Sequence, residues 1–315
     1  MTLSNVLSQR FSTGEASPTI KISNLVTWLT ALIILLALVA TSIGLFWQDE
    51  GNLFSFNTLR GDTVSIVGRG LYRYDTTLMA MGFKAGDAVT LILGIPTLIF
   101  SLLRYRHGSV KGGLLLAGTL AYFLYNYCSM AFGAAYNHLF LVYVVLMSAS
   151  LFGLILTLMS FDLATLPAHF SAHLPRRNIG IYSIVSGIVL LLIWPVLSII
   201  PALVEGKAPP EVWSYTTVIT YAIDMGIVAP ALIAAGVMLL HRNPLGYLLS
   251  SILLVFTVML GTNLLTAGTL QMLAGFIDMP QFIGFVASFA ILTLYAIWFT
   301  LALFRNLSDE ISHEA

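Results

Sequence analysis

Long apolar stretches separated by short polar ones make up almost the whole chain. Eight stretches are nearly free of charge over lengths close to those required to cross a bilayer, at residues 25–47, 87–104, 112–133, 136–161, 180–203, 215–241, 244–266 and 282–304. A hydrocarbon core about 30 Å thick needs roughly 20 residues of helix, and lipid offers no partner to backbone N–H or C=O groups. The pattern therefore predicts an all-α fold, a polytopic transmembrane helical bundle of about eight spans.

The longest polar segment, residues 48–86, predicts a small extracytoplasmic cap between spans 1 and 2. Within it, FSFNTLRGDTVSIVG alternates apolar and polar residues around a Gly-Asp pair, which is typical of a β-hairpin turn. The following DTTLMAMGFKAG indicates a short helix on the membrane surface, capped by Asp75 and ended by Gly82.

The distribution of basic residues predicts the orientation. With residues 1–24 as a cytoplasmic tail, the bundle at 25–305 and residues 306–315 as a second cytoplasmic tail, nine Lys and Arg residues lie inside and five outside. Cytoplasmic loops carry the excess of basic residues, so both termini are expected in the cytoplasm. The 24 polar residues that precede the first apolar stretch are too many for a cleaved signal peptide, so that stretch is expected to remain as a helix.

Composition supports the membrane interpretation and excludes several classes. The chain has 315 residues, 58% hydrophobic and 9% charged, with a net charge of zero and a mean hydropathy of +0.92. Soluble domains carry about 25% charged residues, so a water-facing surface is excluded. Nothing indicates a nucleic-acid partner. Cys128 is the single cysteine, and the sequence contains no phosphate loop and no metal or cofactor motif, so no cofactor is expected.

Polar residues inside the spans gather in the halves assigned to the outer face. Helical spacing places Tyr122 and Asn126 on one face of span 3, and Tyr221 and Asp224 on one face of span 6. Polar faces turn toward neighbouring helices or a cavity rather than toward lipid. We therefore expect one outward-facing intramembrane pocket, lined by Asp224, Asp87, Asn126, His138, Tyr221, Tyr122 and Asn263.

Prolines follow both intramembrane acids. Pro96 comes after Asp87 and Pro230 after Asp224, and a helix-interior proline leaves a carbonyl group without its hydrogen bond. A kink beside a buried acid is a way of building a polar site at depth. The similar order of acid and proline in spans 2 and 6 also raises the hypothesis of two parallel repeats of four spans.

Each candidate has a purely structural alternative. Asp224 is either the titratable centre of the pocket or a protonated acid bonded to Tyr221 or a neighbouring helix. Asp87 follows a glycine at the predicted start of span 2, where N-capping alone accounts for it. His138 suits a loop carbonyl as well as a ligand, and no metal-binding spacing accompanies it. Asn126 and Asn263 either bridge helices or contact a ligand.

Part of the chain carries a family resemblance. GDAVTLILGIPTLIFSLL and YFLYNYCSMAFGAAYNHLFLVYV, within residues 70–161, resemble an uncharacterised family of bacterial multi-pass integral membrane proteins. The resemblance implies the bacterial cytoplasmic (inner) membrane as location and supplies no activity and no functional residue.

Three functional hypotheses follow. The first is binding or transport of a small molecule or ion, with Asp224 coupling to a proton or cation and with Asp87 and the Asn side chains orienting the ligand. The second is a membrane-embedded enzyme acting on lipid or a small molecule from the outer face, with His138 and an Asp as acid and base. The third is a non-catalytic sensor or scaffold. The expected partners are the lipid bilayer, a small-molecule or ion ligand and, as a possibility, further copies of the chain.

Overall fold

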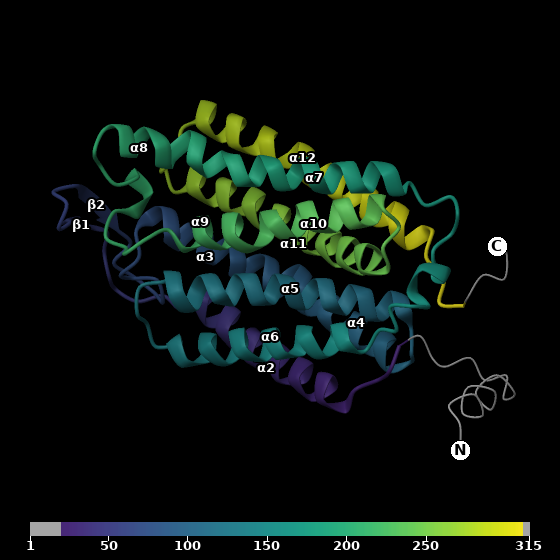
Figure 1. Cartoon of the computed structure of the whole chain (residues 1–315). Coiled ribbons are helices and arrows are strands. Elements are labelled where there is room, and N and C mark those ends of the chain that lie inside the picture. Colours follow the sequence, from purple (N-terminus) through teal and green to yellow (C-terminus); the bar gives the residue numbers. More distant parts are fainter. Residues whose placement is uncertain (1–19, 311–315) are drawn as a thin grey trace, which may run out of the picture.

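A computed structural model describes residues 20–310 of the chain as an elongated bundle of helices (Figure 1). Eight helical segments are long and apolar enough to cross a membrane, which confirms the predicted all-α bundle and its number of spans. Both described ends of the chain lie at one end of the bundle, called here the terminal end, and the β-hairpin lies at the other, the hairpin end. Residues 1–19 and 311–315 of the predicted tails lie outside the described residues.

The spans are continuous helices, three of which contain a π-helical turn (η). Spans 1, 3, 4, 7 and 8 are α2 (Asn24–Phe46), α5 (Val110–Gly133), α6 (Phe140–Met159), α11 (Pro244–Leu273) and α12 (Met279–Arg305). Span 2 runs through α3 (Thr77–Val89), η1 (Thr90–Gly94) and α4 (Ile95–Arg106). Span 5 runs through α7 (Arg176–Trp194), η3 (Pro195–Ile199) and α8 (Ile200–Val204), and span 6 through α9 (Ile219–Ile223), η5 (Asp224–Val228) and α10 (Ala229–Leu240). Two 3₁₀ turns, η2 (Leu166–His169) and η4 (Pro210–Val212), lie in loops.

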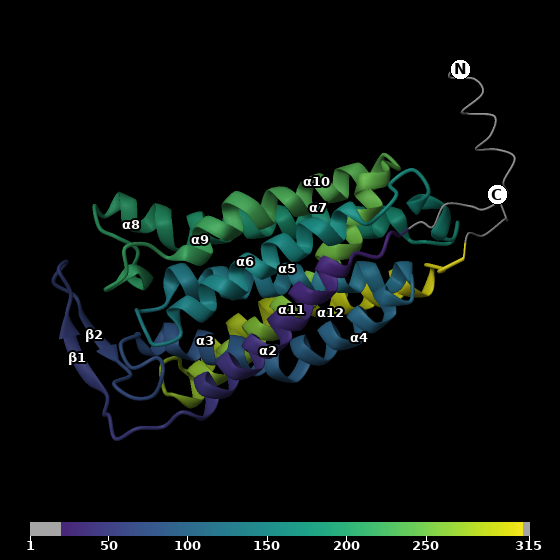
Figure 2. The same cartoon turned by 90° about the horizontal axis from the view of Figure 1, so that it is seen from below.

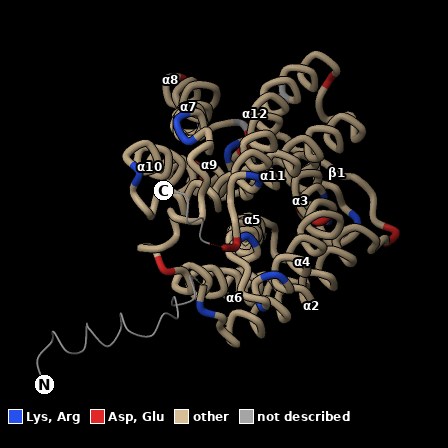
Figure 3. The backbone as a smooth tube through the Cα atoms, turned by 90° about the vertical axis from the view of Figure 1, so that its right-hand side faces the viewer, with Lys and Arg blue, Asp and Glu red and all other residues tan. Residues whose placement is uncertain are grey.

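The helices form two groups that meet along α5 and α11. In the first group, α2 packs on α6 and on α3 and α4, while α5 packs on α4 and α6. In the second group, the packing order is α7, α10, α11, α12, and α11 also packs on α3 and α5. Viewed from the terminal end, α5 lies near the middle of the bundle (Figure 3), and 67% of its apolar stretch is buried, against 17% for α7–α8 and 18% for α12. Spans 5 and 8 are therefore the ones most open to lipid.

The hairpin is confirmed. Strands β1 (Phe54–Asn57) and β2 (Thr63–Ile66) pair antiparallel, and both lie beyond the helices at the hairpin end (Figure 2). Gly61 at the tip of the turn has φ 89°, a conformation that glycine adopts without steric cost. The Arg60 side chain next to it donates a hydrogen bond to the carbonyl of Trp213 at 2.8 Å, which ties the hairpin to the loop between spans 5 and 6.

Span 2 begins about ten residues earlier than the sequence indicates, at Thr77 rather than at Asp87. Thr76 caps the helix by accepting a hydrogen bond from the N–H of Met79, so the prediction that Asp75 is the cap is wrong. Gly82 does not end the helix either, because the burial of residues such as Phe83 on the bundle outweighs the cost of about 1 kcal/mol for a helical glycine. The expected surface helix is thus the first part of span 2.

The three π-helical turns share one relation to proline. Each is followed by a single residue and then by a proline, namely Pro96, Pro201 and Pro230. The residue before the proline donates its N–H five residues back, so that Ala229, for example, bonds to the carbonyl of Asp224. A proline ring clashes with the carbonyl four residues earlier in a regular α-helix, and a wider turn relieves this clash. The kinks expected beside Pro96 and Pro230 are therefore π-helical turns.

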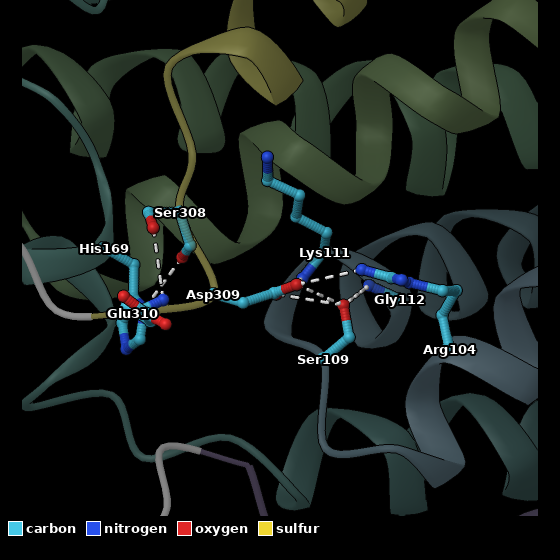
Figure 4. Close-up of polar contacts among 8 residues, drawn as sticks. All are labelled: Arg104, Ser109, Lys111, Gly112, His169, Ser308, Asp309 and Glu310. Atoms are coloured by element: carbon cyan, nitrogen blue, oxygen red, sulfur yellow. Dashed lines mark hydrogen bonds and ion pairs between the residues drawn. The ribbon is translucent and has the colours of Figure 1, made fainter.

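The described C-terminal segment is docked across the terminal end (Figure 4). The carboxylate of Asp309 accepts hydrogen bonds from the hydroxyl of Ser109 at 2.9 Å and from the backbone N–H of Lys111 at 3.0 Å, at the start of α5. Arg104 pairs with the same carboxylate at 3.2 Å. A carboxylate is stabilised at a helix N-terminus, where N–H groups lack partners within the helix. This contact joins the end of the chain to α4 and α5.

Candidate functional site

Asp224 lies at the first position of η5 with 4% of its surface exposed. One carboxylate oxygen accepts a hydrogen bond from the hydroxyl of Tyr125 on α5, and the other accepts one from the indole N–H of Trp194 on α7, both at 2.9 Å. Burying a carboxylate is costly unless it is hydrogen-bonded, and here both oxygens have partners from other spans. Asp224 thus joins the two groups of helices.

A line of polar side chains extends from Asp224 toward the hairpin end. The ring of Tyr221 stacks on Trp194 with centroids 4.6 Å apart, and the Tyr221 hydroxyl donates to Ser198 at 3.4 Å. Ser198 in turn donates to the carboxylate of Glu211 at 2.7 Å. Ser198 also lines a hollow of about 600 Å³ at the hairpin end, whose other walls include Arg60, Asp62, Glu205 and Lys207. Charged groups thus surround the hairpin-end side of this line.

Asp87 is the centre of a second polar group. It is fully buried in α3, and one of its oxygens accepts a hydrogen bond of 2.6 Å from the hydroxyl of Tyr72. Tyr72 comes from the cap, and its own burial, followed by the nearby Asp87 carboxylate, raises its pKa well above the ordinary value. Gly44 on α2 comes so close that a Cβ placed there would lie 1.9 Å from the Asp87 carboxylate. The interpretation of Asp87 as an N-cap at the membrane edge is wrong.

Tyrosine, threonine and asparagine side chains surround Asp87. The hydroxyl of Tyr122 lies 3.3 Å from that of Thr90, and the Asn126 side chain donates to the same hydroxyl at 3.4 Å. The Tyr127 hydroxyl and the second oxygen of Asp87 are buried and make no hydrogen bond of standard geometry within the described residues. This second group is thus tightly packed, and only part of its polar atoms make hydrogen bonds within the described residues.

The positions of the two acids along their spans differ from expectation. Asp224 is five residues from the start of its span at Ile219, about 8 Å along the helix at 1.5 Å per residue. Asp87 is ten residues from the start of its span at Thr77, about 15 Å. Asp87, expected at the start of its span, is therefore well inside it, and Asp224 is closer to the start of its own span than the sequence predicts.

The structure does not bring the seven predicted residues together. Asp87, Tyr122 and Asn126 form one group, and Asp224 and Tyr221 belong to another. The physical reason is the geometry of α5: one residue turns an α-helix by about 100°, so Asn126 is directed to span 2 while the adjacent Tyr125 is directed to span 6. The expectation of a single shared pocket is therefore replaced by two separate polar groups.

The two remaining residues lie elsewhere. His138 precedes α6 at the hairpin end, where its exposed ring stacks on Trp47 at 5.7 Å and lines a small hollow of about 160 Å³. Asn263 on α11 has a buried side-chain oxygen that makes no hydrogen bond within the described residues. Within the described residues, neither His138 nor Asn263 is hydrogen-bonded to Asp87 or Asp224.

Sequence reasoning missed three partners of the acids. Tyr125 was overlooked beside Tyr122 and Asn126 because the polar face of span 3 was assigned to one side only. Trp194 lies inside a span, where its indole N–H needs a hydrogen-bond acceptor. This requirement could have indicated a contact with a buried acid such as Asp224. Tyr72 belongs to the cap, and no local pattern could have connected it with Asp87.

A third buried acid joins the loops outside the spans. One oxygen of Asp75 accepts hydrogen bonds from the backbone N–H of Ala135 and from the hydroxyl of Tyr215, both at 2.8 Å. Its second oxygen is buried and has no partner within the described residues. Burial raises the pKa of Asp75 from its ordinary 3.8 to about 6, although both hydrogen bonds act in the opposite direction. Asp75 thus connects the cap, the turn between spans 3 and 4 and the loop between spans 5 and 6.

No group of three or more His, Cys, Asp or Glu residues gathers as a metal site in residues 20–310. Comparisons of the chain with protein-family models, with curated proteins and with solved structures find no match. The resemblance to bacterial multi-pass membrane proteins, the cytoplasmic placement of the termini and the possible homo-oligomer therefore stay predictions.

Proposed function

We propose that this integral membrane protein binds and moves a small ion or molecule, and that the carboxylate of Asp224 carries the coupled proton or cation. The observation that carries the proposal is the setting of Asp224, a buried acid in a π-helical turn whose two carboxylate oxygens are held by side chains of two other spans. Acids inside membrane spans are costly and commonly mark ion or proton pathways, and π-helical turns are frequent at functional sites.

The polar line of Tyr221, Ser198 and Glu211 supports entry from the hairpin end. It begins at the charged hollow beside Lys207 and ends next to Trp194, one of the two residues that hold Asp224. A proton or small cation that enters this hollow has carboxylate and hydroxyl oxygens as successive partners.

Asp87 is assigned a supporting role in this proposal. Its hydrogen bond to Tyr72 holds the cap on the bundle, and the group around it is closed by Gly44. The two acids also follow a common plan, since each span that carries one has a π-helical turn followed by a proline. Span 5 has the same turn and proline without a buried acid, so it is the combination of all three features in spans 2 and 6 that agrees with the hypothesis of two repeats of four spans.

Proton and sodium fluxes into proteoliposomes test the proposal. Purified protein is reconstituted with an internal pH dye, and a membrane potential is imposed with potassium and valinomycin. We expect internal acidification faster than in protein-free liposomes, and a loss of this excess in Asp224→Asn. A parallel measurement with radiolabelled sodium distinguishes a proton from a small cation.

A matched control uses an acid outside the proposed pathway. Asp309→Asn changes a carboxylate that caps α5 at the terminal end, and its flux should equal that of the wild type. Wild-type liposomes without excess flux of either ion, or an Asp224→Asn variant with undiminished flux, would contradict the proposal.

The enzyme alternative loses its proposed pair of residues. His138 stacks on Trp47 outside the spans, whereas Asp87 and Asp224 are buried with other partners. Within the described residues, no hydrogen bond or ion pair joins His138 to an acid, as that mechanism requires, so we do not propose it.

A further inference from the structure

An apolar cavity of about 240 Å³ lies among four spans of the second group, α7, α10, α11 and α12. Apart from a few hydroxyls its lining is aliphatic and aromatic, with Leu260 and Phe256 on one side and Leu292 on another. An apolar cavity of about 150 Å³ in a protein interior stays dry and accepts small apolar molecules. The lining of this cavity is similarly apolar, so an apolar body fits it better than water does.

Its position determines how a ligand reaches it. Spans 5 and 8, which provide two of its walls, are the least buried of the eight, with 17% and 18% of their apolar stretches covered. α7 packs mainly on α10 and α12 mainly on α11, so these outer walls face lipid. The surrounding medium therefore supplies lipid-dissolved molecules, whereas ions and polar solutes are excluded from it.

Among the described residues, one hydroxyl in the cavity wall makes no hydrogen bond of standard geometry. The hydroxyls of Thr257, Ser288 and Thr293 donate to carbonyls of their own helices at 2.7–2.8 Å. The Tyr182 hydroxyl donates across to the carbonyl of Leu292 at 2.8 Å. The hydroxyl without such a bond belongs to Ser186, which lines the cavity with 7% of its surface exposed and whose side chain neighbours the hydroxyl of Tyr182. A buried hydroxyl without a partner costs free energy, and a bound ligand with a polar end would remove that cost.

The cavity also adjoins the group around Asp224. Val228, one of its lining residues, is the last residue of η5, the π-helical turn that Asp224 begins. Phe256, another lining residue, packs edge-to-face on Tyr125 with centroids 5.7 Å apart, and Tyr125 holds Asp224. An occupant of the cavity therefore touches both the turn that carries the acid and the ring behind its hydrogen-bond donor.

We infer that this cavity binds an uncharged amphiphile from the lipid phase, a molecule with an aliphatic body and one hydroxyl-like end group bonded to Ser186. The binding site stands on the cavity itself, while the identification of its occupant as the transported substrate rests on the proposed function. The substrate class is then a lipid-dissolved compound whose movement is coupled to Asp224.

Photolabelling in proteoliposomes tests the site. The probe is a long-chain fatty alcohol with a diazirine in its chain, with the unlabelled alcohol as competitor and peptide mass spectrometry as readout. We expect competable labelling of α7 and α11 around Ser186 and Leu260. Leu260→Trp, which fills the cavity, should abolish it, and Ser186→Ala, which keeps the volume, should weaken binding about fivefold through one lost hydrogen bond.

The control variant is Val185→Trp, a change of similar size on α7 at a position that is 49% exposed and does not line the cavity. It should label like the wild type. Labelling that is spread over the lipid-facing surface, is not competed by the alcohol, or is equal in Leu260→Trp and Val185→Trp would overturn the site. If Leu260→Trp fails to fold, Ser186→Ala alone decides, since unchanged binding in that variant also overturns it.

The two proposals fail separately. Competable labelling together with an Asp224→Asn variant that keeps its ion flux would support the site and contradict the coupling. Flux that depends on Asp224, together with unspecific labelling, would overturn the site and leave the proposed function in place.

Discussion

The buried carboxyl of Asp75 should make the contacts of the loops at the hairpin end dependent on pH. In the folded protein its pKa is about 6, because burial disfavours the charged form, whereas an unfolded Asp titrates near 3.8. Protonated Asp75 therefore stabilises the closed loops fully below pH 3.8, and this contribution to their stability is lost as the pH rises through 6. The difference corresponds to roughly 3 kcal/mol for any opening that exposes Asp75 to water.

Amide hydrogen exchange measures this effect at the backbone of Ala135 and Thr76, whose N–H groups bond to Asp75 and Tyr215. After correction for the intrinsic pH dependence of exchange, protection should fall by roughly a hundredfold between pH 4 and pH 7.5. In Asp75→Asn the amide oxygen still accepts both hydrogen bonds but does not titrate, so the corrected protection should be independent of pH.

Asp62→Asn is the control, because Asp62 lies exposed in the hairpin turn of the same cap. Asp62→Asn should show the same fall in amide protection with rising pH as the wild type. If the wild-type protection is constant over this range, or if Asp75→Asn declines in the same way, burial of a titrating Asp75 is not what governs these contacts.

Three further changes test the packing around Asp87 and the terminal end. Gly44→Ala would place a Cβ 1.9 Å from the Asp87 carboxylate and should lower the free energy of unfolding by about 1–3 kcal/mol. The control Gly82→Ala places a Cβ with no atom within 4 Å and should be neutral or slightly stabilising. Thermal unfolding in micelles measures both. Equal unfolding temperatures would refute the close approach. Tyr72→Phe leaves one Asp87 oxygen without its donor and should cost about 1–3 kcal/mol, with faster proteolysis of the cap; unchanged cleavage would argue against this attachment. Asp309→Ala should cost about 1 kcal/mol, and less in high salt; an effect independent of salt would speak against an electrostatic contact.

The spans could be predicted from the sequence because their length and apolarity are imposed by the bilayer. Seven of them begin within four residues of the predicted positions, and the exception is span 2. There Gly82 suggested the end of a short helix and Gly86 the end of the loop. Both are inside a helix, and Gly86 allows close approach of the Asn126 side chain. A glycine that ends a helix and one that permits close packing look the same in a single sequence.

The candidate site was less predictable, for a reason visible in α5. Helical spacing correctly placed Tyr122 and Asn126 on one face, since both lie near Thr90. Spacing cannot tell which span that face meets, nor that the adjacent Tyr125 meets another span. Partners that come from distant segments, such as Tyr72 for Asp87, depend on the tertiary arrangement alone.

The π-helical turns have a mechanical consequence for the spans that contain them. Each turn holds one residue more than an α-helical turn, and its conversion to a regular α-helix would rotate everything beyond it by about 100° and displace it by about 1.5 Å. In span 6 such a conversion would re-aim the stretch after Val228 relative to Asp224. The π-helical turn therefore fixes the angular offset between the two parts of each of these spans, and the proline after it favours the wider turn.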